Sequence, residues 1–255
     1  MKPSVLSVGL VATLLVGCGD GPAKQAPPSA KTTGAAPAPP PPSATASAAA
    51  ARPKPRECPP GSEITFDEPT MEAAIRVQLS KPAGAITKAE LAKVKTLNLS
   101  EAKKNDHLDP CIFPALAGLK SLYLAPGTLE DITLLKDKTQ LESLRLSISQ
   151  VKDLSPLAGL TKLDRLDLGR TPVSDLKPLS ELLNLTELLL DQTEVTDLTP
   201  LEKLEKLEVV SIKNTRVTSV APLAKMKNLK SLDITGSLVA DLTPVKSLPK
   251  LKIVQ

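Results

Sequence analysis

Aliphatic residues recur with one fixed period over the second half of the chain. The period is 22 residues, and it restarts at Leu119, Leu141, Leu163, Leu185, Leu207, Leu229 and Leu251. A fixed period of this length is typical of a solenoid, in which each unit packs only against its neighbours. Because a solenoid chiefly presents a surface, the pattern favours binding over catalysis.

Each unit combines a short strand with a turn. In the unit that begins at Leu163, the residues from Leu166 to Leu168 alternate with the period of two that a strand requires. The aliphatic residues that follow are irregularly spaced, as in a tight loop and one helical turn. Stacking buries the leucines of each unit against the next and places the strands about 4.8 Å apart in a parallel sheet.

Two columns of polar residues repeat as well. The first consists of Ser149, Thr171, Thr193, Thr215 and Ser237. We expect these hydroxyl groups to form a ladder that satisfies buried backbone groups of the loops. The second consists of Asp131, Asp153, Asp175, Asp197 and Asp241. Stacked carboxylates repel one another, so we expect each to accept N–H groups of its turn rather than to bind a metal ion.

Three units place a hydroxyl residue directly before proline. The pairs are Ser155-Pro156, Thr199-Pro200 and Thr243-Pro244. A hydroxyl can cap a free N–H and proline presets the backbone angle φ, so each pair predicts the start of a short helix or 3₁₀ turn.

The first units depart from the pattern. An early unit starts at Val94 and takes 25 residues to reach Leu119, so it carries an insertion. In the next unit, Leu134 and Lys138 stand where other units have proline and an aliphatic residue.

The repeated positions resemble the internalin-type leucine-rich repeat family. Its pattern is close to L-x-x-L-x-L-x-x-N-x-I-x-D-I-x-P-L-x-x-L, and here Thr or Ser replaces Asn while Val replaces Ile. The resemblance covers residues 94–255. It implies an α/β solenoid with a curved parallel sheet on the concave face, 3₁₀ or short helical turns on the convex face and an N-terminal helical cap. Such a fold hosts many functions, so the resemblance does not name a ligand.

The segment 57–93 is expected to cap the N-terminal end of the solenoid. An amphipathic helix that begins near Pro69 would group Met71, Ala74, Ile75, Val77 and Leu79. Thr87 and Glu90 form a capping-box pattern, which predicts a second short helix that runs toward Val94.

The last unit, over Leu251–Val254, predicts a strand with no capping helix after it. Such a strand leaves a sheet edge and an apolar end face. We expect this end to dock on another chain or on a second copy of the same chain.

Residues 1–17 have the charged start and short apolar core of a secretory signal peptide. They end in Leu15-Val16-Gly17-Cys18, which resembles the bacterial lipobox. The resemblance implies that Cys18 is acylated and becomes the membrane anchor; the alternative is an ordinary signal peptide with a chance cysteine. Gly19, rather than Asp, follows the cysteine, which favours the outer membrane or cell surface within the bacterial envelope.

Residues 18–56 are rich in Ala, Pro, Ser and Thr, and they predict a disordered or polyproline-like tether. With Cys18 lipidated, Cys58 and Cys111 remain. Two cysteines in an exported protein usually pair, so we expect a Cys58–Cys111 disulfide between the cap and the first repeat.

The basic character of the chain belongs to its N-terminal segment. The sequence pI is about 8.9, but six basic residues and one acidic residue precede Glu57, which leaves 26 basic and 27 acidic residues for the remainder. With no basic face and few aromatic residues, nucleic-acid binding is not expected. His107 is the only histidine, and no catalytic, metal-binding or cofactor-binding motif is present, so we expect no enzyme activity, metal ion or cofactor.

The outward side chains of the strands are the default binding surface. Our candidates are Tyr123, Arg145, Arg165, Asp167, Glu187, Leu189 and Asp191. Adjacent units pair Arg145 with Asp167 and Arg165 with Glu187, which represent either exposed ion pairs of under about 1 kcal/mol each or a mixed-charge recognition patch. Because hot spots are rich in Trp, Tyr and Arg, one Tyr and no Trp favour a modest polar interface.

The sequence therefore predicts an envelope-anchored lipoprotein whose repeat domain recognises a protein or a glycan without catalysis. A structural or assembly role, with docking through the C-terminal end, is the alternative.

Overall fold

The computed structural model describes residues 57–103 and 106–255, all within one compact unit, Pro53–Gln255. The predicted signal peptide, the lipidated Cys18 and the tether lie outside the described residues. No helix among the described residues has the length and apolar character that a membrane crossing requires.

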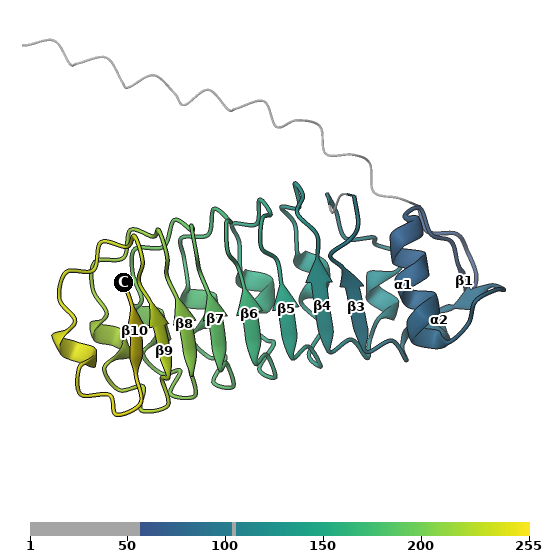
Figure 1. The fold of residues 1–255 in the computed structure, drawn as a ribbon. Coiled ribbons are helices and arrows are strands. Elements are labelled where there is room, and N and C mark those ends of the chain that lie inside the picture. Colours follow the sequence, from purple (N-terminus) through teal and green to yellow (C-terminus); the bar gives the residue numbers. More distant parts are fainter. Residues whose placement is uncertain (1–56, 104–105) are drawn as a thin grey trace, which may run out of the picture. The chain divides into compact units, whose positions relative to one another are not determined.

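Eight parallel strands form one sheet in sequence order (Figure 1). They are β3 (Thr96–Leu99), β4 (Ser121–Leu124), β5 (Ser143–Arg145), β6 (Arg165–Asp167), β7 (Glu187–Leu189), β8 (Val209–Ser211), β9 (Ser231–Asp233) and β10 (Lys252–Val254). One 3₁₀ turn follows each strand from β3 to β9, on the side of the solenoid opposite the sheet. These turns are Phe113–Ala115, Thr133–Leu135, Ser155–Leu157, Lys177–Leu179, Thr199–Leu201, Ala221–Leu223 and Thr243–Val245. The predicted leucine-rich repeat solenoid is confirmed.

The repeat period places equivalent aliphatic residues on top of one another. Leu166 pairs in register with Leu144 on one side and with Leu188 on the other, and all three are at most 1 % exposed. The turn leucines, such as Leu179 and Leu201, are equally buried. One continuous apolar core therefore runs along the solenoid, because no single unit could bury its leucines alone.

The acidic column has the structural role that its spacing predicts. Carboxylates of Asp131, Asp153, Asp175, Asp197 and Asp241 each accept a hydrogen bond from the backbone N–H two residues later, at 2.8–2.9 Å. The Ser-Pro and Thr-Pro pairs begin 3₁₀ turns at Ser155, Thr199 and Thr243, as predicted, but the predicted capping by the hydroxyl is wrong. The hydroxyls of Ser155 and Thr199 cap no N–H of the 3₁₀ turn but donate to Asp153 and Asp197. Aspartate thus holds the start of each turn, because its side chain reaches the N–H two residues on.

The hydroxyl column satisfies buried loop carbonyls at its three threonines, as predicted, but not at its two serines. Thr171, Thr193 and Thr215 each donate to the carbonyl oxygen three residues earlier in the same loop, at 2.6–2.7 Å. The buried hydroxyls of Ser149 and Ser237 have no hydrogen-bond partner.

The N-terminal segment contains two antiparallel strands and two helices. β1 (Glu63–Ile64) pairs with β2 (Ile86–Thr87), α1 spans Pro69–Leu79, and α2 spans Lys88–Leu91. Met71 and Ile75 join the same core as the repeats, and α1 lies beside β3 (Figure 1). Val77 was expected on the buried face but is 75 % exposed, because it points away from the packed side of the helix. That this segment caps the solenoid stays a prediction.

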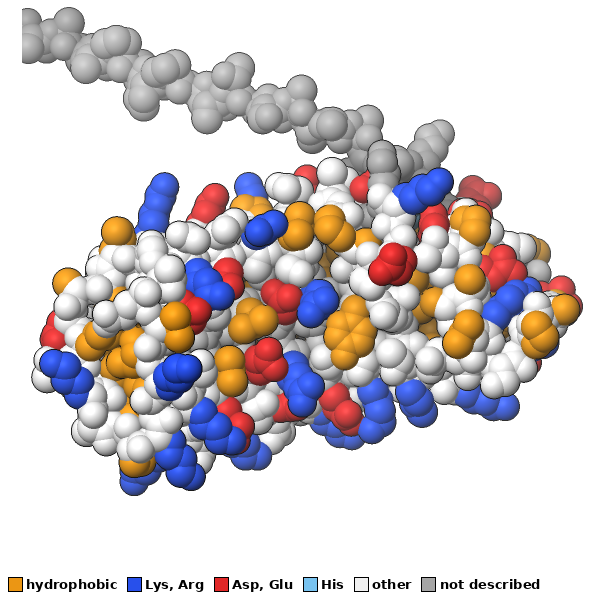
Figure 2. All heavy atoms as spheres, in the orientation of Figure 1, with side chains coloured by type: hydrophobic (Ala, Val, Ile, Leu, Met, Phe, Trp, Pro, Cys, Tyr) orange, Lys and Arg blue, Asp and Glu red, His pale blue; other side chains and the backbone are white. Residues whose placement is uncertain are grey.

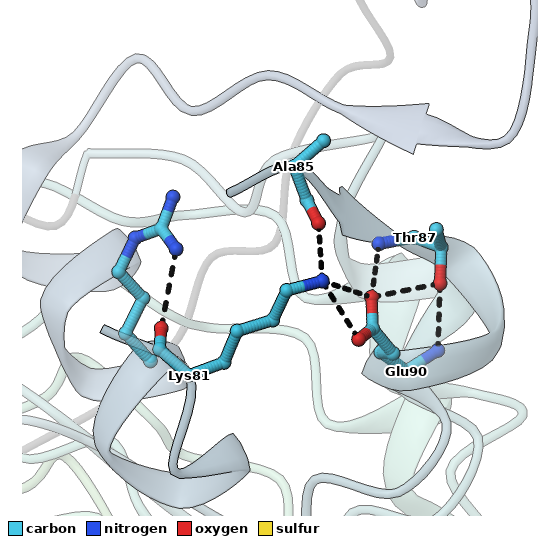
Figure 3. A network of polar contacts seen from close by, with 5 residues as sticks. Lys81, Ala85, Thr87 and Glu90 are labelled. Atoms are coloured by element: carbon cyan, nitrogen blue, oxygen red, sulfur yellow. Dashed lines mark hydrogen bonds and ion pairs between the residues drawn. The ribbon is translucent and has the colours of Figure 1, made fainter. Parts of the chain in front are cut away.

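The capping box predicted at Thr87 and Glu90 is confirmed. The Thr87 hydroxyl accepts the Glu90 N–H at 3.3 Å, while a Glu90 carboxylate oxygen accepts the Thr87 N–H at 2.8 Å (Figure 3). Lys81 adds an ion pair to Glu90 at 2.9 Å and donates to the carbonyl oxygen of Ala85. The Lys81 hydrogen bond, followed by those from Thr87, lowers the pKa of Glu90 to about 2.

Two further features set the first repeats apart. Cys58 and Cys111 form a disulfide in the structure, with Cα atoms 5.4 Å apart across a sequence separation of 53 residues. Lys138 occupies a position that is aliphatic in later repeats and is 3 % exposed; its Nζ donates to the carbonyl of Pro114 at 3.3 Å. Burial lowers the pKa of this amine.

Candidate functional site

The parallel register assembles two rows of outward side chains on the sheet. One row contains Tyr123, Arg145, Asp167, Leu189, Ser211 and Asp233. The other contains Ser121, Ser143, Arg165, Glu187, Val209 and Ser231. Basic and acidic side chains are interspersed over this face, with apolar groups between them (Figure 2).

Tyr123, Arg145 and Asp167 form a cluster across β4, β5 and β6. The guanidinium carbon of Arg145 lies 5.9 Å from the centre of the Tyr123 ring, which is within cation–π distance. Arg145 Nε also lies 3.2 Å from Asp167 Oδ2. Half of the Arg145 side chain nevertheless remains exposed, at 51 %, so a partner can still reach it.

Arg165 is held more loosely. Its Nε lies 4.0 Å from Glu187 Oε2 and 3.6 Å from Asp164 Oδ2, and the side chain is 64 % exposed. The sequence predicts the pair of Arg165 with Glu187, but it does not predict the closer contact of Arg165 with Asp164. The neighbouring carboxylate precedes the strand, so strand alternation alone gave no signal for it.

Asp191 belongs to a separate cluster at the ends of β7, β8 and β9. It accepts hydrogen bonds from the Ser211 hydroxyl and from the Lys213 backbone N–H. Lys213 Nζ lies 3.2 Å from Asp233 and 3.8 Å from Asp191, and the hydrogen bond to Asp233 is the largest of the interactions that raise the pKa of Lys213. Lys213 was not among the predicted surface residues, although it stands two residues beyond the end of β8 and 22 residues after Asp191.

A shallow depression of about 220 Å³ marks the centre of the strand face. Six of the seven predicted surface residues line it: Tyr123, Arg145, Arg165, Asp167, Glu187 and Leu189. Asp191 does not. The structure thus brings most of the candidates into one surface, with a tyrosine ring and a leucine side chain beside two arginines and two carboxylates.

A second depression, of about 310 Å³, lies between α1 and β3. It is lined by Thr70, Ala73, Ala74, Val77, Gln78, Thr96 and Asn98, none of which is charged. The two depressions therefore differ in chemistry, and only the one on β4–β7 offers charged groups that could orient a ligand.

The described residues contain no group of three His, Cys, Asp or Glu side chains that could hold a metal ion. His107 is exposed, and Asp109 is buried in the same loop, where it accepts the Cys111 N–H at 2.7 Å. Asp109 therefore stabilises the loop that contains His107.

The comparisons agree with this architecture. Residues 139–181 and 206–250 match the family model described as "Leucine Rich repeats (2 copies)". Internalin C2 of Listeria monocytogenes is 27 % identical with a TM-score of 0.67, covering 78 % of this chain and 99 % of its own. Internalin F of the same bacterium is 26 % identical with a TM-score of 0.65, covering 74 % of this chain and 56 % of its own.

A leucine-rich repeat protein of Leptospira interrogans is 25 % identical with a TM-score of 0.59, covering 65 % of this chain and 44 % of its own. No curated protein matches the chain. The repeats are leucine-rich repeats of the internalin type, as the sequence predicts.

Proposed function

We propose that this internalin-type leucine-rich repeat protein is a non-catalytic binding module, which recognises a protein partner through the outward face of its parallel sheet. The observation that carries the proposal is the depression on β4–β7, where Tyr123, Arg145 and Leu189 lie together. Tyr and Arg are enriched among residues that dominate protein interfaces. Contacts with Tyr123 and Asp167 already restrict Arg145, which reduces the side-chain freedom that binding must remove.

The charges of this surface favour specific binding rather than high affinity. Arg145 and Arg165 lie beside Asp167 and Glu187, so a partner must match both signs of charge in the right order. The open shape of the face fits a macromolecule better than a small ligand, which would need to be largely enclosed.

The location proposed for the module is the bacterial envelope. Support comes from the lipobox-like ending at Cys18 and the Pro/Ala-rich segment that follows it. The unchanged chain should incorporate labelled palmitate in the producing cells, whereas a Cys18→Ala variant should not. Absence of label from the unchanged chain, or equal labelling of both forms, would overturn the lipid anchor at Cys18 without touching the binding proposal.

Affinity capture from native envelope extract tests the binding surface. The double variant Arg145→Glu/Leu189→Lys changes two lining residues and should lose the partner that the unchanged protein retains. Lys177→Glu/Leu183→Lys is the matched control, because it makes the same types of change at exposed positions outside the sheet. A protein retained equally by all three forms would overturn the proposal, and capture of a glycan alone would change the ligand class.

One specific observation favours a second candidate, assembly through β10. Near the C-terminal end of the solenoid Leu238 is 60 % and Val254 37 % exposed, while the core-facing Leu251 and Ile253 are only partly buried. A second copy of the chain could cover this end. Light scattering at tens of micromolar tests it: a monomeric mass for the unchanged protein would remove the candidate.

A further inference from the structure

Five equivalent loop residues, each three positions after the end of one of β5 to β9, share the left-handed backbone conformation. They are Ile148, Arg170, Gln192, Asn214 and Gly236, with φ between 51° and 69°. Glycine and asparagine tolerate this region, whereas a β-branched side chain there clashes with its own backbone. Ile148, at φ 59°, is therefore the residue least suited to its position.

The strain at Ile148 is not offset by burial of its side chain. Its side chain is 40 % exposed, and it is not among the residues that pack against the apolar core. The backbone bonds of the loop do not require isoleucine either. The Ile148 N–H donates to the Gly169 carbonyl at 2.8 Å and its carbonyl accepts the Gly127 N–H at 3.0 Å, which any residue could do.

Ile148 lies in the loop after β5, three residues beyond Arg145. Arg145 contacts Tyr123 and lines the depression on β4–β7, whereas Ile148 does not line it. Arg170 occupies the equivalent position of the next repeat. It is exposed, and none of the described residues forms an ion pair with it. The Ile148 N–H donates to the carbonyl of Gly169, the residue before Arg170, so an exposed apolar residue and an exposed arginine occupy neighbouring repeats.

We propose that Ile148 is a partner-contacting residue, retained in a strained conformation because it binds an apolar side chain of a protein segment that also carries a carboxylate. This inference rests on the proposed function and names the chemistry of the partner. The apolar contact would cover Ile148, and the carboxylate would pair with Arg145 or Arg170, since a charge-assisted bond to guanidinium is among the stronger polar contacts. Strained residues that their surroundings do not explain cluster at such sites.

Ile148→Asn gives a test in which stability and binding change in opposite directions. The probe is an immobilised set of 12-residue peptides, each with an aliphatic or aromatic residue within three positions of Glu or Asp, beside a matched set with Lys at the acidic position. The unchanged protein should prefer the acidic set. Ile148→Asn should bind that set about fivefold or more weakly while its midpoint of thermal unfolding rises, because Asn tolerates the left-handed region.

Gln192→Asn is the matched control, since it lies in the same column and conformation. It should leave peptide binding unchanged. Retention of binding by Ile148→Asn, or no preference of the unchanged protein for the acidic set, would overturn the inference. If Arg145→Glu/Leu189→Lys loses the peptides while Ile148→Asn does not, only the inference fails; if neither variant loses them, the proposed function fails as well.

Discussion

The regular repeats from Leu141 to Lys250 and the N-terminal region from Glu57 to Gln140 reach stability by different means. In the regular repeats the same local bonds recur, such as Asp197 to the Thr199 N–H and Thr193 to the Leu190 carbonyl. The N-terminal region depends on features that occur once among the described residues. These are the Cys58–Cys111 disulfide, the Thr87–Glu90 capping box with Lys81, and a buried Lys138.

The difference follows from the one-dimensional nature of a solenoid. A unit with neighbours on both sides buries its leucines by stacking, so one set of bonds can be repeated. The first unit has a helical segment rather than a repeat on one side, and its insertion interrupts the period. A disulfide, a capping box and a buried amine then supplement the periodic packing. Four predictions test this contrast, in order of decreasing expected effect.

Leu188→Ala should cause the largest loss of stability. Leu188 is fully buried between Leu166 and Val210 of the adjacent strands, and removing such a side chain lowers the free energy of unfolding by about 2–5 kcal/mol. The control is Leu251→Ala, at a partly buried position of the last repeat, which should lose clearly less. Urea unfolding of both variants gives the comparison. Equal losses would contradict the view that two-sided stacking stabilises the regular repeats.

Replacing both Cys58 and Cys111 by Ser should destabilise the N-terminal region by about 2–4 kcal/mol. Hydrogen exchange should accelerate over residues 57–99 and remain slow over residues 141–250, because the disulfide lies outside the regular repeats. Intact mass before and after reduction checks the bond itself. Two free thiols in the native protein would contradict it.

Thr193→Val should cost about 1 kcal/mol, since it removes the 2.7 Å hydrogen bond from the hydroxyl to the Leu190 carbonyl and nearly preserves shape. Ser149→Ala removes a buried hydroxyl of the same column that has no hydrogen-bond partner, so stability should stay the same or rise. Thermal unfolding of the pair distinguishes the two sites. An equal loss in both variants would show that the column acts through packing alone.

Acid should lower the free energy of unfolding of both regions. This is the smallest of the four expected effects, because water screens partly exposed carboxylates. The folded pKa of Glu90, about 2, lies below its usual value of 4.5, so its stabilising contribution is present above pH 4.5 and is lost as pH falls toward 2. Asp197 of a regular repeat has a lowered pKa for a similar reason, chiefly the hydrogen bond from the Thr199 hydroxyl.

Glu90→Gln and Asp197→Asn should each remove part of this acid dependence. The free energy of unfolding measured between pH 2 and pH 6 shows whether the unchanged protein falls more steeply than either variant. Parallel curves for all three proteins would exclude a stabilising role for both carboxylates.

The sequence by itself determined the repeat period, the parallel sheet, the helices at Pro69 and Thr87 and the bonds of the aspartate column. Each of these depends on spacing within one unit or on the constant offset between units, and both can be read from a linear chain. For the same reason, the register placed six of the seven candidate surface residues in one depression.

The tertiary structure alone decided the rest. It brought Asp164 to Arg165 and Lys213 between Asp191 and Asp233, turned the threonine hydroxyls into their own loops, and left Ile148 exposed in the left-handed region. These features depend on side-chain rotamers and backbone angles that packing against the neighbouring repeats selects. A periodic pattern specifies which residues are neighbours, but only the packed chain fixes how their polar atoms meet.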